Sequence, residues 1–374
     1  MTPKYHDTIL AREVAAVIAT DPDLVRKARK HLDSLTKPLE SLGRLEELAE
    51  RLFAIQGSSP ISASPARMLT IAADHGVVAE GVASSPKEVT RLMVNNFLQG
   101  GAAINSLCEA AGAQLRVIDA GVDSGPFASH ELFIDAKIAR GTANMAEGPA
   151  MTDEQCARAL KLGCDLAESA FRDGVRVLGT GEMGIGNTTA SSALLCAYLG
   201  FSAAEMTGMG AGVPRAGLEH KTRVIEKALR TNAQAVESQD SFSILAALGG
   251  LEIAALAGVV LGGAARRMAV VIDGFISTAA FTAAWKMAPA ARDYCIFSHA
   301  SAESGHARAL ERLGAKPLLD LGMRLGEGTG AALGFFLLEA AAKAFNNMAT
   351  LEKARIALGV AVAGQADETV SEAK

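Results

Sequence analysis

The stretch Leu321–Leu333 reads Leu-Gly-Met-Arg-Leu-Gly-Glu-Gly-Thr-Gly-Ala-Ala-Leu, and the interpretation of the whole chain starts from it. It follows a short β-like run, Lys316–Asp320, and precedes an apolar segment with helical spacing. This order predicts a strand-to-helix turn, in which the glycines permit unusual backbone angles or the close approach of a ligand. Glu327 is the one acidic residue of the stretch.

Two interpretations of Glu327 are open at this point. A carboxyl group in a tight apolar turn is partly desolvated, which raises its pKa and suits a general base. Alternatively, Glu327 lies in the first turn of a helix and complements the helix dipole. The stretch alone favours the second interpretation, and the rest of the chain has to decide.

Short apolar runs precede longer helical segments throughout the middle of the chain. Each run ends in a turn that contains Gly, Asp or His, which is typical of parallel strands joined by helices and buried on both faces. The sequence therefore predicts an α/β fold, with a Rossmann-like, mostly parallel sheet of about six strands flanked by helices. The predicted strands are Arg67–Ala73, Leu115–Asp119, Val175–Gly179, Ala269–Asp273, Tyr294–Ser298 and Lys316–Leu321.

In sheets of this type, ligands bind beyond the carboxyl ends of the strands. We therefore expect the chemistry in the turns that follow the predicted strands. These turns are Asp74–Gly76, Gly121, Thr180–Thr189, Asp273-Gly274, His299–Ser304 and Leu325–Gly330.

Both ends of the chain have apolar residues at helical spacing. Val25–Leu35 and Leu39–Phe53 are the clearest segments before the sheet, and Gly57–Pro65 is the best linker candidate. Ala331–Asn346 and Leu351–Leu358 are their counterparts after it. We predict a small helical domain, residues 1–62 completed by 335–374, and an α/β catalytic domain, residues 63–334.

Composition excludes several classes of partner. The net charge is −5, no basic block is present, and the aromatic residues number 13 Phe, 3 Tyr and 1 Trp, so nucleic acid is not expected to bind.

Five cysteines without a CxxC pair indicate buried thiols in a reducing compartment. The first residues lack an apolar signal core, which predicts a cytoplasmic protein.

The run Ile244–Ala265 is apolar and long enough to cross a bilayer. However, Glu252 lies inside it, where a charge costs a few kcal/mol in lipid, and Gly249-Gly250 interrupts it. We therefore expect two buried helices, or one broken helix, and no membrane span.

The turn Gly181–Thr189 has features of an anion site. Gly184 and Gly186 free the backbone, and Asn187, Thr188 and Thr189 supply donors at a predicted helix N-terminus, which binds phosphate through unpaired N–H groups. It is neither a Walker A loop nor a GxGxxG fingerprint, and an ordinary strand–helix turn is the alternative. Lys221 offers a cation, although a lone lysine on a helix is usually solvated.

The remaining polar turns favour neither a metal nor a hydrolase triad. No histidine pair has metal-ligand spacing, and Gly-x-Ser-x-Gly is absent. His75 and His299 are interpreted as hydrogen-bonded loop residues. Asp273 follows a strand as a single acid, so no magnesium–diphosphate donor is implied, although one carboxylate can hold a ribose diol. No metal and no cofactor are expected.

Taken together, the motifs resemble one family, the nicotinate-nucleotide–dimethylbenzimidazole phosphoribosyltransferases of cobalamin lower-ligand synthesis. Each motif is weak alone, but their order over nearly the whole chain is specific. The matching stretches are Lys37–Glu46 (KPLESLGRLE), Ala73–Val82 (ADHGVVAEGV), Ser85–Thr90 (SPKEVT), Gly181–Thr189 (GEMGIGNTT), Asp273–Phe275 (DGF), Ser298–Glu303 (SHASAE) and Met323–Ala332 (MRLGEGTGAA).

The resemblance implies a reaction between two small molecules. Nicotinate mononucleotide donates its phosphoribosyl group to 5,6-dimethylbenzimidazole, giving α-ribazole 5′-phosphate and nicotinate with inversion at C1′. The family's general base falls on Glu327. A homodimer of Rossmann-like subunits is also implied. A kinase on the same scaffold would lack its Gly-Lys-Ser/Thr motif, and a nucleotide-binding regulatory protein would leave Glu327 without a purpose.

The resemblance also assigns binding residues. The phosphate site matches Gly184, Ile185, Gly186, Asn187 and Thr188, assisted by Lys221 and Ser301; Glu182 and Asp273 match positions near the ribose and nicotinate; Ser85, Met93, Leu325 and Gly326 match the acceptor pocket. Met93 stands where the family pattern has glutamine. Another benzimidazole, adenine or a phenol is therefore an alternative acceptor.

Overall fold

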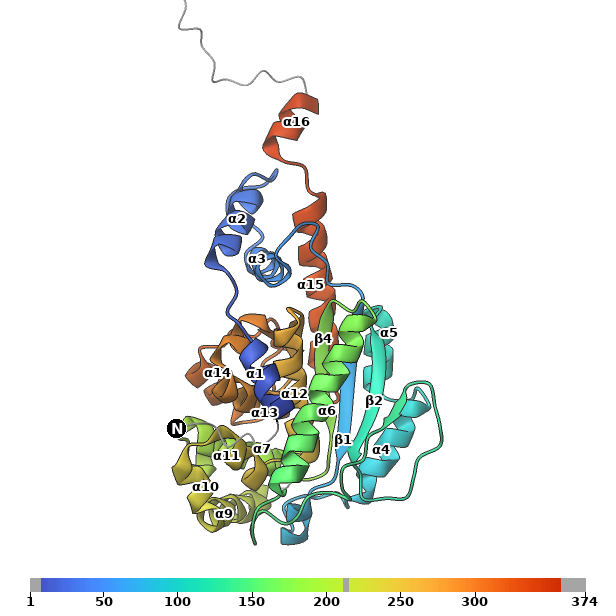
Figure 1. The fold of residues 1–374 in the computed structure, drawn as a ribbon, viewed down its shortest axis with the longest axis vertical. Helices are drawn as coiled ribbons and strands as arrows, with labels where there is room; N and C mark the ends of the chain where they lie inside the picture. The colour runs from blue at the N-terminus through green and yellow to red at the C-terminus, as the bar shows by residue number, and fades with distance from the viewer. Residues whose placement is uncertain (1–7, 211–214, 358–374) are drawn as a thin grey trace, which may run out of the picture.

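A single parallel sheet organises the molecule, which is described here from a computed structural model of residues 8–210 and 215–357 (Figure 1). Within these residues the strand order is β3-β2-β1-β4-β5-β6, and every neighbouring pair is parallel. The predicted six-stranded α/β fold is confirmed. The strands are β1 (Ala66–Ala73), β2 (Gln114–Gly121), β3 (Phe133–Asp135), β4 (Val177–Met183), β5 (Ala269–Ile272) and β6 (Cys295–Phe297).

The strand order reverses between β1 and β4. The chain runs from β1 outward to β2 and β3, then returns to β4 on the other side of β1 and continues to β5 and β6. At such a switch point the loops diverge and leave a crevice at the carboxyl ends of the strands. The functional site is therefore expected beyond the ends of β1 and β4.

The predicted strand Lys316–Leu321 is wrong, and a short strand was missed. Leu319 makes one isolated parallel bridge with His299, and the flanking backbone bonds irregularly to the end of β6, so no ladder forms. Pro317 has no N–H group to donate to a ladder. The missed strand, β3, has three residues, and its apolar run Leu132–Ile134 is too short to predict a strand.

Helices cover both faces of the sheet (Figure 1). On one face α12 (Leu251–Ala265) contacts β1, β4 and β5, with α6 (Asp153–Arg172) packed on it. On the other face lie α4 (Glu88–Leu98), α5 (Ala103–Ala110) and α15 (Thr329–Asn347). The remaining helices are α1 (Thr8–Ala16), α2 (Pro22–Asp33), α3 (Arg44–Gln56), α7 (Asn187–Leu199), α8 (Ala203–Met206), α9 (Arg215–Thr231), α10 (Ala233–Ser238), α11 (Ser241–Leu248), α13 (Phe275–Met287), α14 (His306–Leu313) and α16 (Leu351–Ala357), with 3-10 turns η1 (Gly76–Glu80) and η2 (Pro289–Tyr294).

The long apolar run is broken into two helices, as predicted. α11 ends at Leu248, α12 begins at Leu251, and both are buried. Glu252, in the first turn of α12, accepts a 2.6 Å hydrogen bond from the His75 ring. Among the described residues, no helix combines the length and apolar character that a bilayer crossing requires.

Two glycines let α6 and α12 approach closely. A Cβ atom at Gly163 would lie 1.9 Å from the Ala255 carbonyl oxygen, and one at Gly258 would lie 2.0 Å from the Leu160 carbonyl oxygen. Both clashes are with backbone, which cannot rotate away. The helix pair therefore depends on the absence of side chains at these two positions.

Gly163→Ala is expected to lower the free energy of unfolding by about 1–3 kcal/mol. Alanine favours a helix over glycine by about 1 kcal/mol, but overpacking a tight core site usually costs more. The midpoint of urea unfolding measures the change. Gly148→Ala is the control, because no heavy atom of the described residues lies within 4 Å of the added Cβ. An unchanged or raised midpoint for Gly163→Ala would show that the two helices separate without cost.

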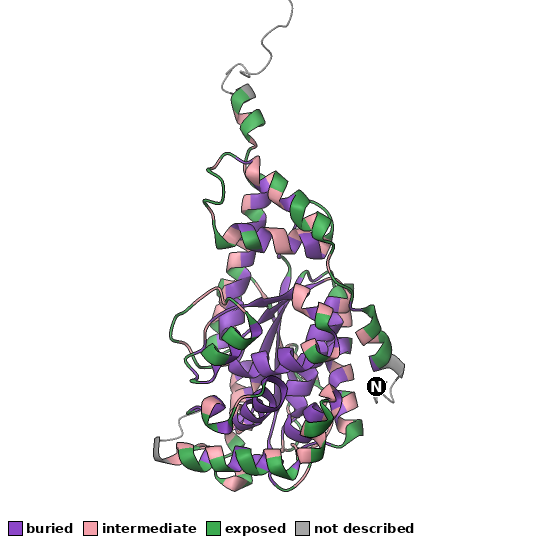
Figure 2. Ribbon diagram, turned by 90° about the vertical axis from the view of Figure 1, so that its left-hand side faces the viewer, coloured by how far each residue is buried: buried purple, intermediate pink, exposed green. Residues whose placement is uncertain are grey.

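The helices near the two chain ends meet at the far end of α15. The Phe345 carbonyl oxygen lies 2.8 Å from the His31 ring nitrogen, and the Phe345 ring packs against Phe53. Figure 2 shows these helices with exposed outer faces, whereas the sheet and α12 are buried. By contrast, α1 packs on the α/β part, where Glu13 pairs with Arg266 at 2.7 Å. The division at residues 62 and 335 stays a prediction, and its residues 1–7 and 358–374 lie outside the described residues.

Candidate active site

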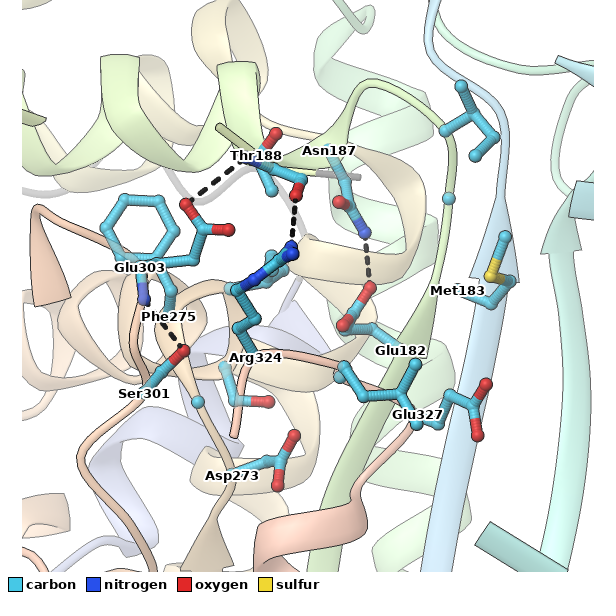
Figure 3. A pocket seen from close by; sticks show the side chains of 18 of the residues that line it. Glu182, Met183, Asn187, Thr188, Asp273, Phe275, Ser301, Glu303, Arg324 and Glu327 are labelled. Carbon is cyan, nitrogen blue, oxygen red and sulfur yellow. Dashed lines mark hydrogen bonds between the residues drawn. The ribbon is translucent and has the colours of Figure 1, made fainter. Parts of the chain in front are cut away.

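A cavity of about 370 Å³ opens at the carboxyl ends of β4, β5 and β6, beside the start of α4 (Figure 3). All the predicted site residues line it except Gly186 and Lys221. The lining residues are Ser85, Val89, Met93, Glu182, Met183, Gly184, Ile185, Asn187, Thr188, Gly210, Asp273, Gly274, Phe275, Ile276, Ser277, His299, Ser301, Glu303, Arg324, Leu325, Gly326 and Glu327.

Two of the turns expected to carry chemistry do not line this cavity. Asp74–Gly76 and Gly121 lie beside it, and His75 is held by Glu252, which confirms a hydrogen-bonded loop histidine. Conversely, Glu303 and Arg324 line the cavity without having been assigned a role. Glu303 lies inside the turn His299–Ser304, and Arg324 directly precedes the turn Leu325–Gly330, so a charged side chain at these turns could have indicated both. Val89 and Met183 lie within Ser85–Thr90 and Thr180–Thr189, but an apolar side chain there does not by itself indicate a binding role.

Glu327 lies ahead of the last long helix and not within it. α15 begins at Thr329 with Gly328 as its N-cap, so the interpretation of Glu327 as a first-turn residue is wrong. Its backbone is in the left-handed region, with φ of 63°, which is uncommon for a residue other than glycine. Thr70 Oγ1 donates to its carbonyl oxygen at 2.9 Å, and a Cβ at Gly181 would lie 2.3 Å from that oxygen. The turn is therefore pressed against β1 and β4.

The Glu327 carboxyl group is buried, with 4% of the residue exposed. Its Oε2 accepts one hydrogen bond among the described residues, from the Ile104 N–H at 3.4 Å, at the start of α5. Burial raises the pKa of Glu327, and the Ile104 N–H lowers it by less. A buried carboxylate with few hydrogen bonds binds a proton more readily than a solvated one.

Glu182 and Asp273 are more firmly held than Glu327. Asn187 donates its side-chain amide to Glu182, and burial raises the Glu182 pKa to about 8. Asp273 Oδ1 accepts the Ala331 N–H at 2.9 Å and so caps the start of α15; burial raises its pKa to about 7. A Cβ at Gly326 would lie 2.2 Å from Glu182 Oε1, so Gly326 makes room for the Glu182 carboxyl group.

Glu182→Gln is expected to flatten the fall of stability with rising pH. The ordinary pKa of 4.5 becomes about 8 in the folded state, so the folded protein binds more protons between these values. Stability from this group is therefore present below pH 4.5 and lost as pH rises through about 8. The difference between the melting temperatures at pH 6 and pH 9 should be smaller in the variant than in the parent. Asp273 contributes equally to this difference in the two proteins. Equal differences would contradict the assignment.

The predicted anion turn has the geometry of a helix N-terminus. Gly186 is the N-cap of α7 with φ of 96°, and Asn187 and Thr188 form its first turn. The Ile185 N–H is not free, because it donates to Thr90 Oγ1 at 3.2 Å. Ile185 therefore faces the cavity through its side chain. The Asn187 N–H donates to the Gly184 carbonyl oxygen at 3.2 Å, so the N-terminus of α7 offers the positive end of the dipole and the Thr188 side chain.

Lys221 is buried behind this turn, so the interpretation as a solvated lysine is wrong. Its ammonium group donates to Thr188 Oγ1 at 2.9 Å and to the Gly208 carbonyl oxygen at 3.1 Å. Burial lowers the pKa of Lys221 to about 8. The lysine thus brings positive charge to Thr188 without lining the cavity itself.

Three further polar groups stand at the same end of the cavity. Arg324 donates to the Gly210 carbonyl oxygen at 3.0 Å, and Glu303 Oε2 accepts the Gly210 N–H at 3.3 Å. Ser301 Oγ accepts the Glu303 N–H at 3.3 Å. Figure 3 shows Ser301, Glu303 and Arg324 on one side and Glu327 with Met183 on the other. The cavity therefore has one polar end, where Arg324, Glu303 and Ser301 lie with Lys221 behind Thr188, and one more apolar end with the Glu327 carboxyl group.

Comparison with known proteins shows the family of the chain. The family model described as "Phosphoribosyltransferase" matches residues 17–356. A protein of Oleidesulfovibrio alaskensis named nicotinate-nucleotide–dimethylbenzimidazole phosphoribosyltransferase is 59% identical over 338 residues, which cover 90% of this chain and 94% of that protein. The chain belongs to this phosphoribosyltransferase family. The resemblance inferred from the motifs is confirmed, and the chain is an enzyme of this type.

Other members show the same extent of similarity. A protein of the same name from Nitratidesulfovibrio vulgaris is 56% identical over 92% of this chain and 96% of its own length. The crystal structure of CobT from Thermus thermophilus superposes with a TM-score of 0.84 at 44% identity, covering 91% of this chain and all of that one. The family fold is therefore shared over almost the whole described molecule.

Proposed function

We propose that this phosphoribosyltransferase transfers the phosphoribosyl group of nicotinate mononucleotide to 5,6-dimethylbenzimidazole. One observation carries the proposal: a single cavity joins the N-terminus of α7, with Lys221 behind it, to the lightly hydrogen-bonded carboxyl group of Glu327. The names of the relatives supply the two substrates. The products are α-ribazole 5′-phosphate and nicotinate.

The reaction needs one base and no acid. The pyridinium nitrogen of the mononucleotide takes the electron pair of its bond to C1′, so nicotinate leaves with a neutral ring nitrogen. The unprotonated benzimidazole nitrogen attacks C1′ from the opposite face, which inverts the β centre to α. The proton on the other benzimidazole nitrogen passes to a carboxylate. We assign that carboxylate to Glu327.

Glu327 suits this role better than Glu182 and Asp273. Glu182 has a pKa of about 8 and accepts from Asn187, so it is mostly protonated at neutral pH. Asp273 is engaged by the backbone at the start of α15. Glu327 accepts one long hydrogen bond among the described residues, and it lies on the apolar side of the cavity. We assign Glu182 and Asp273 to the ribose and nicotinate.

The phosphate is assigned to the polar end, at the turn Gly184–Thr188 that leads into α7. The positive end of the α7 dipole and Thr188, with Lys221 behind it, complement a dianion. Gly184 lets the turn pass close to the backbone of β1, since a Cβ there would lie 2.4 Å from the Ala73 carbonyl oxygen. Ser301 adds a hydroxyl group, and Arg324 adds a cation that the sequence did not assign.

The acceptor is assigned to the side that α4 forms with the loop before Glu327. Ser85, Val89, Met93 and Leu325 line it. Methionine is apolar and adaptable, so Met93 is compatible with the dimethyl edge of the benzimidazole. Adenine and phenols are not favoured, because the relatives are named for dimethylbenzimidazole.

The test is incubation with nicotinate mononucleotide and a panel of bases, with mass detection of the nucleoside phosphate and of free nicotinate. We expect both products with 5,6-dimethylbenzimidazole, in equal amounts. Release of nicotinate without a new nucleoside phosphate, or transfer to adenine in preference to the benzimidazole, would overturn the proposal. The homodimer and the cytoplasmic location stay predictions, to be checked by light scattering and by fractionation.

A further inference from the structure

Thr90 lies on α4 between two cavity-lining residues, Val89 and Met93, but its own side chain is fully buried away from the cavity. Its Oγ1 accepts the Ile185 N–H at 3.2 Å. This hydrogen bond joins the helix of the acceptor side to the turn of the phosphate side. The two segments are 95 residues apart in the chain.

The Thr90 hydroxyl also faces the buried Asp74 carboxyl group, and this interaction lowers the Asp74 pKa against the larger effect of burial. Asp74 Oδ2 in turn accepts the Asp123 N–H at 2.7 Å. Asp123 pairs with Lys87, just before α4, at 2.6 Å. Thr90 therefore lies between the Asp74 carboxyl group, just beyond the end of β1, and the turn whose Ile185 N–H it accepts.

We propose that Thr90 is a positioning residue that couples the two halves of the cavity, so that occupancy by the base strengthens binding of the ribose phosphate and the reverse. A base against Val89 and Met93 restrains α4, and the restrained Thr90 hydroxyl fixes the Ile185 amide and with it Gly184 and Gly186. The same bond acts in the other direction, because coupling between two sites is reciprocal.

The packing around the turn supports transmission through this bond. A Cβ at Gly186 would lie 2.8 Å from a Val78 methyl group and 3.3 Å from His75 Cβ, so the turn has little space to move independently. Close-packed groups pass on small displacements instead of absorbing them. Loss of the hydrogen bond to Thr90 would leave the packing of the turn against Val78 and His75 in place. It would remove the hydrogen bond that joins the turn to α4.

The experiment measures the affinity for ribose 5-phosphate by calorimetry, with and without saturating 5,6-dimethylbenzimidazole. Because ribose 5-phosphate carries no leaving group at C1′, the two ligands bind without reacting. The ratio of the two affinities is the coupling factor. Thr90→Val removes the hydroxyl at nearly constant shape, and Thr90→Ser retains it. Ser191→Ala on α7 is the matched control, because it removes a fully buried hydroxyl that has no hydrogen-bond partner in the described part of the chain.

We expect a coupling factor of about 5-fold or more in the parent protein, within the usual range for coupled sites. It should fall to about 1 in Thr90→Val and return towards the parent value in Thr90→Ser, with Ser191→Ala unchanged. A parent factor of 1, or a Thr90→Val factor equal to the parent's, overturns the inference. If Thr90→Val does not fold, a Thr90→Ser factor of about 1 does the same.

The inference rests on the proposed function, yet the two fail differently. If the proposed reaction is wrong, the mass assay gives no nucleoside phosphate with the parent protein. If only the coupling is wrong, the parent protein makes product and Thr90→Val loses rate without losing the coupling factor.

Discussion

Glu327→Gln is expected to keep the fold and the affinity for nicotinate mononucleotide, and to lower turnover about 10²–10⁴-fold, the usual contribution of a positioned general base. Glutamine retains the size of the side chain and can still accept from the Ile104 N–H. It cannot take the benzimidazole proton. Steady-state kcat with 5,6-dimethylbenzimidazole, together with the melting temperature, measures the two expectations separately.

The pH profile gives an independent check on Glu327. The base acts when deprotonated, and burial raises its pKa, so the parent rate should rise with pH through that raised value. The variant should lack this rise. Glu311→Gln, an exposed position on α14, is the matched control and should keep the parent rate. Near-parental turnover for Glu327→Gln, or an unchanged pH limb, would remove the base assignment.

Lys221→Met is expected to raise KM for nicotinate mononucleotide about 10–100-fold with a smaller effect on kcat. A charge-assisted contact is worth about 1.5–3 kcal/mol, and methionine keeps the buried stem while removing the ammonium group. Binding of free nicotinate, which has no phosphate, should change little. Initial rates over a range of mononucleotide, and calorimetry with nicotinate, supply the two numbers.

Lys227 is a suitable control on the same helix. Its ammonium group is on the surface, paired with Glu80 at 3.0 Å, so Lys227→Met should change KM less than about twofold. If Lys221→Met weakens nicotinate and the mononucleotide equally, Lys221 supports the site as a whole and does not serve the phosphate.

Features that depend on neighbouring residues were predictable from the sequence. Apolar runs ending in polar turns predicted β1, β2, β4, β5 and β6, because a strand buried on both faces is mostly apolar. The Gly-Gly break in the apolar run predicted the boundary between α11 and α12. The glycines around Glu327 indicated a turn with unusual backbone angles. Of the site residues assigned from the family resemblance, twelve line one cavity.

Features that depend on contacts between distant segments were not predictable. The burial of Lys221 depends on the carbonyl of Gly208 and on Thr188, and the cap that Asp273 gives α15 spans 58 residues. Nothing local distinguishes Thr90 from any other helical threonine. The prediction of a strand at Lys316–Leu321 failed although the local sequence pattern suits a strand. The backbone of this segment meets the end of β6 without a regular ladder.

The two outermost strands of the sheet, β3 and β6, have three residues each. A long open border would present a row of unpaired amides and carbonyls, on which another chain could add a strand and begin to aggregate. With three residues each, β3 and β6 offer few unpaired backbone groups on which another chain could add a strand. Copies of the protein should therefore associate through the side chains of their helices, and fibrous association during storage or overexpression should be slow.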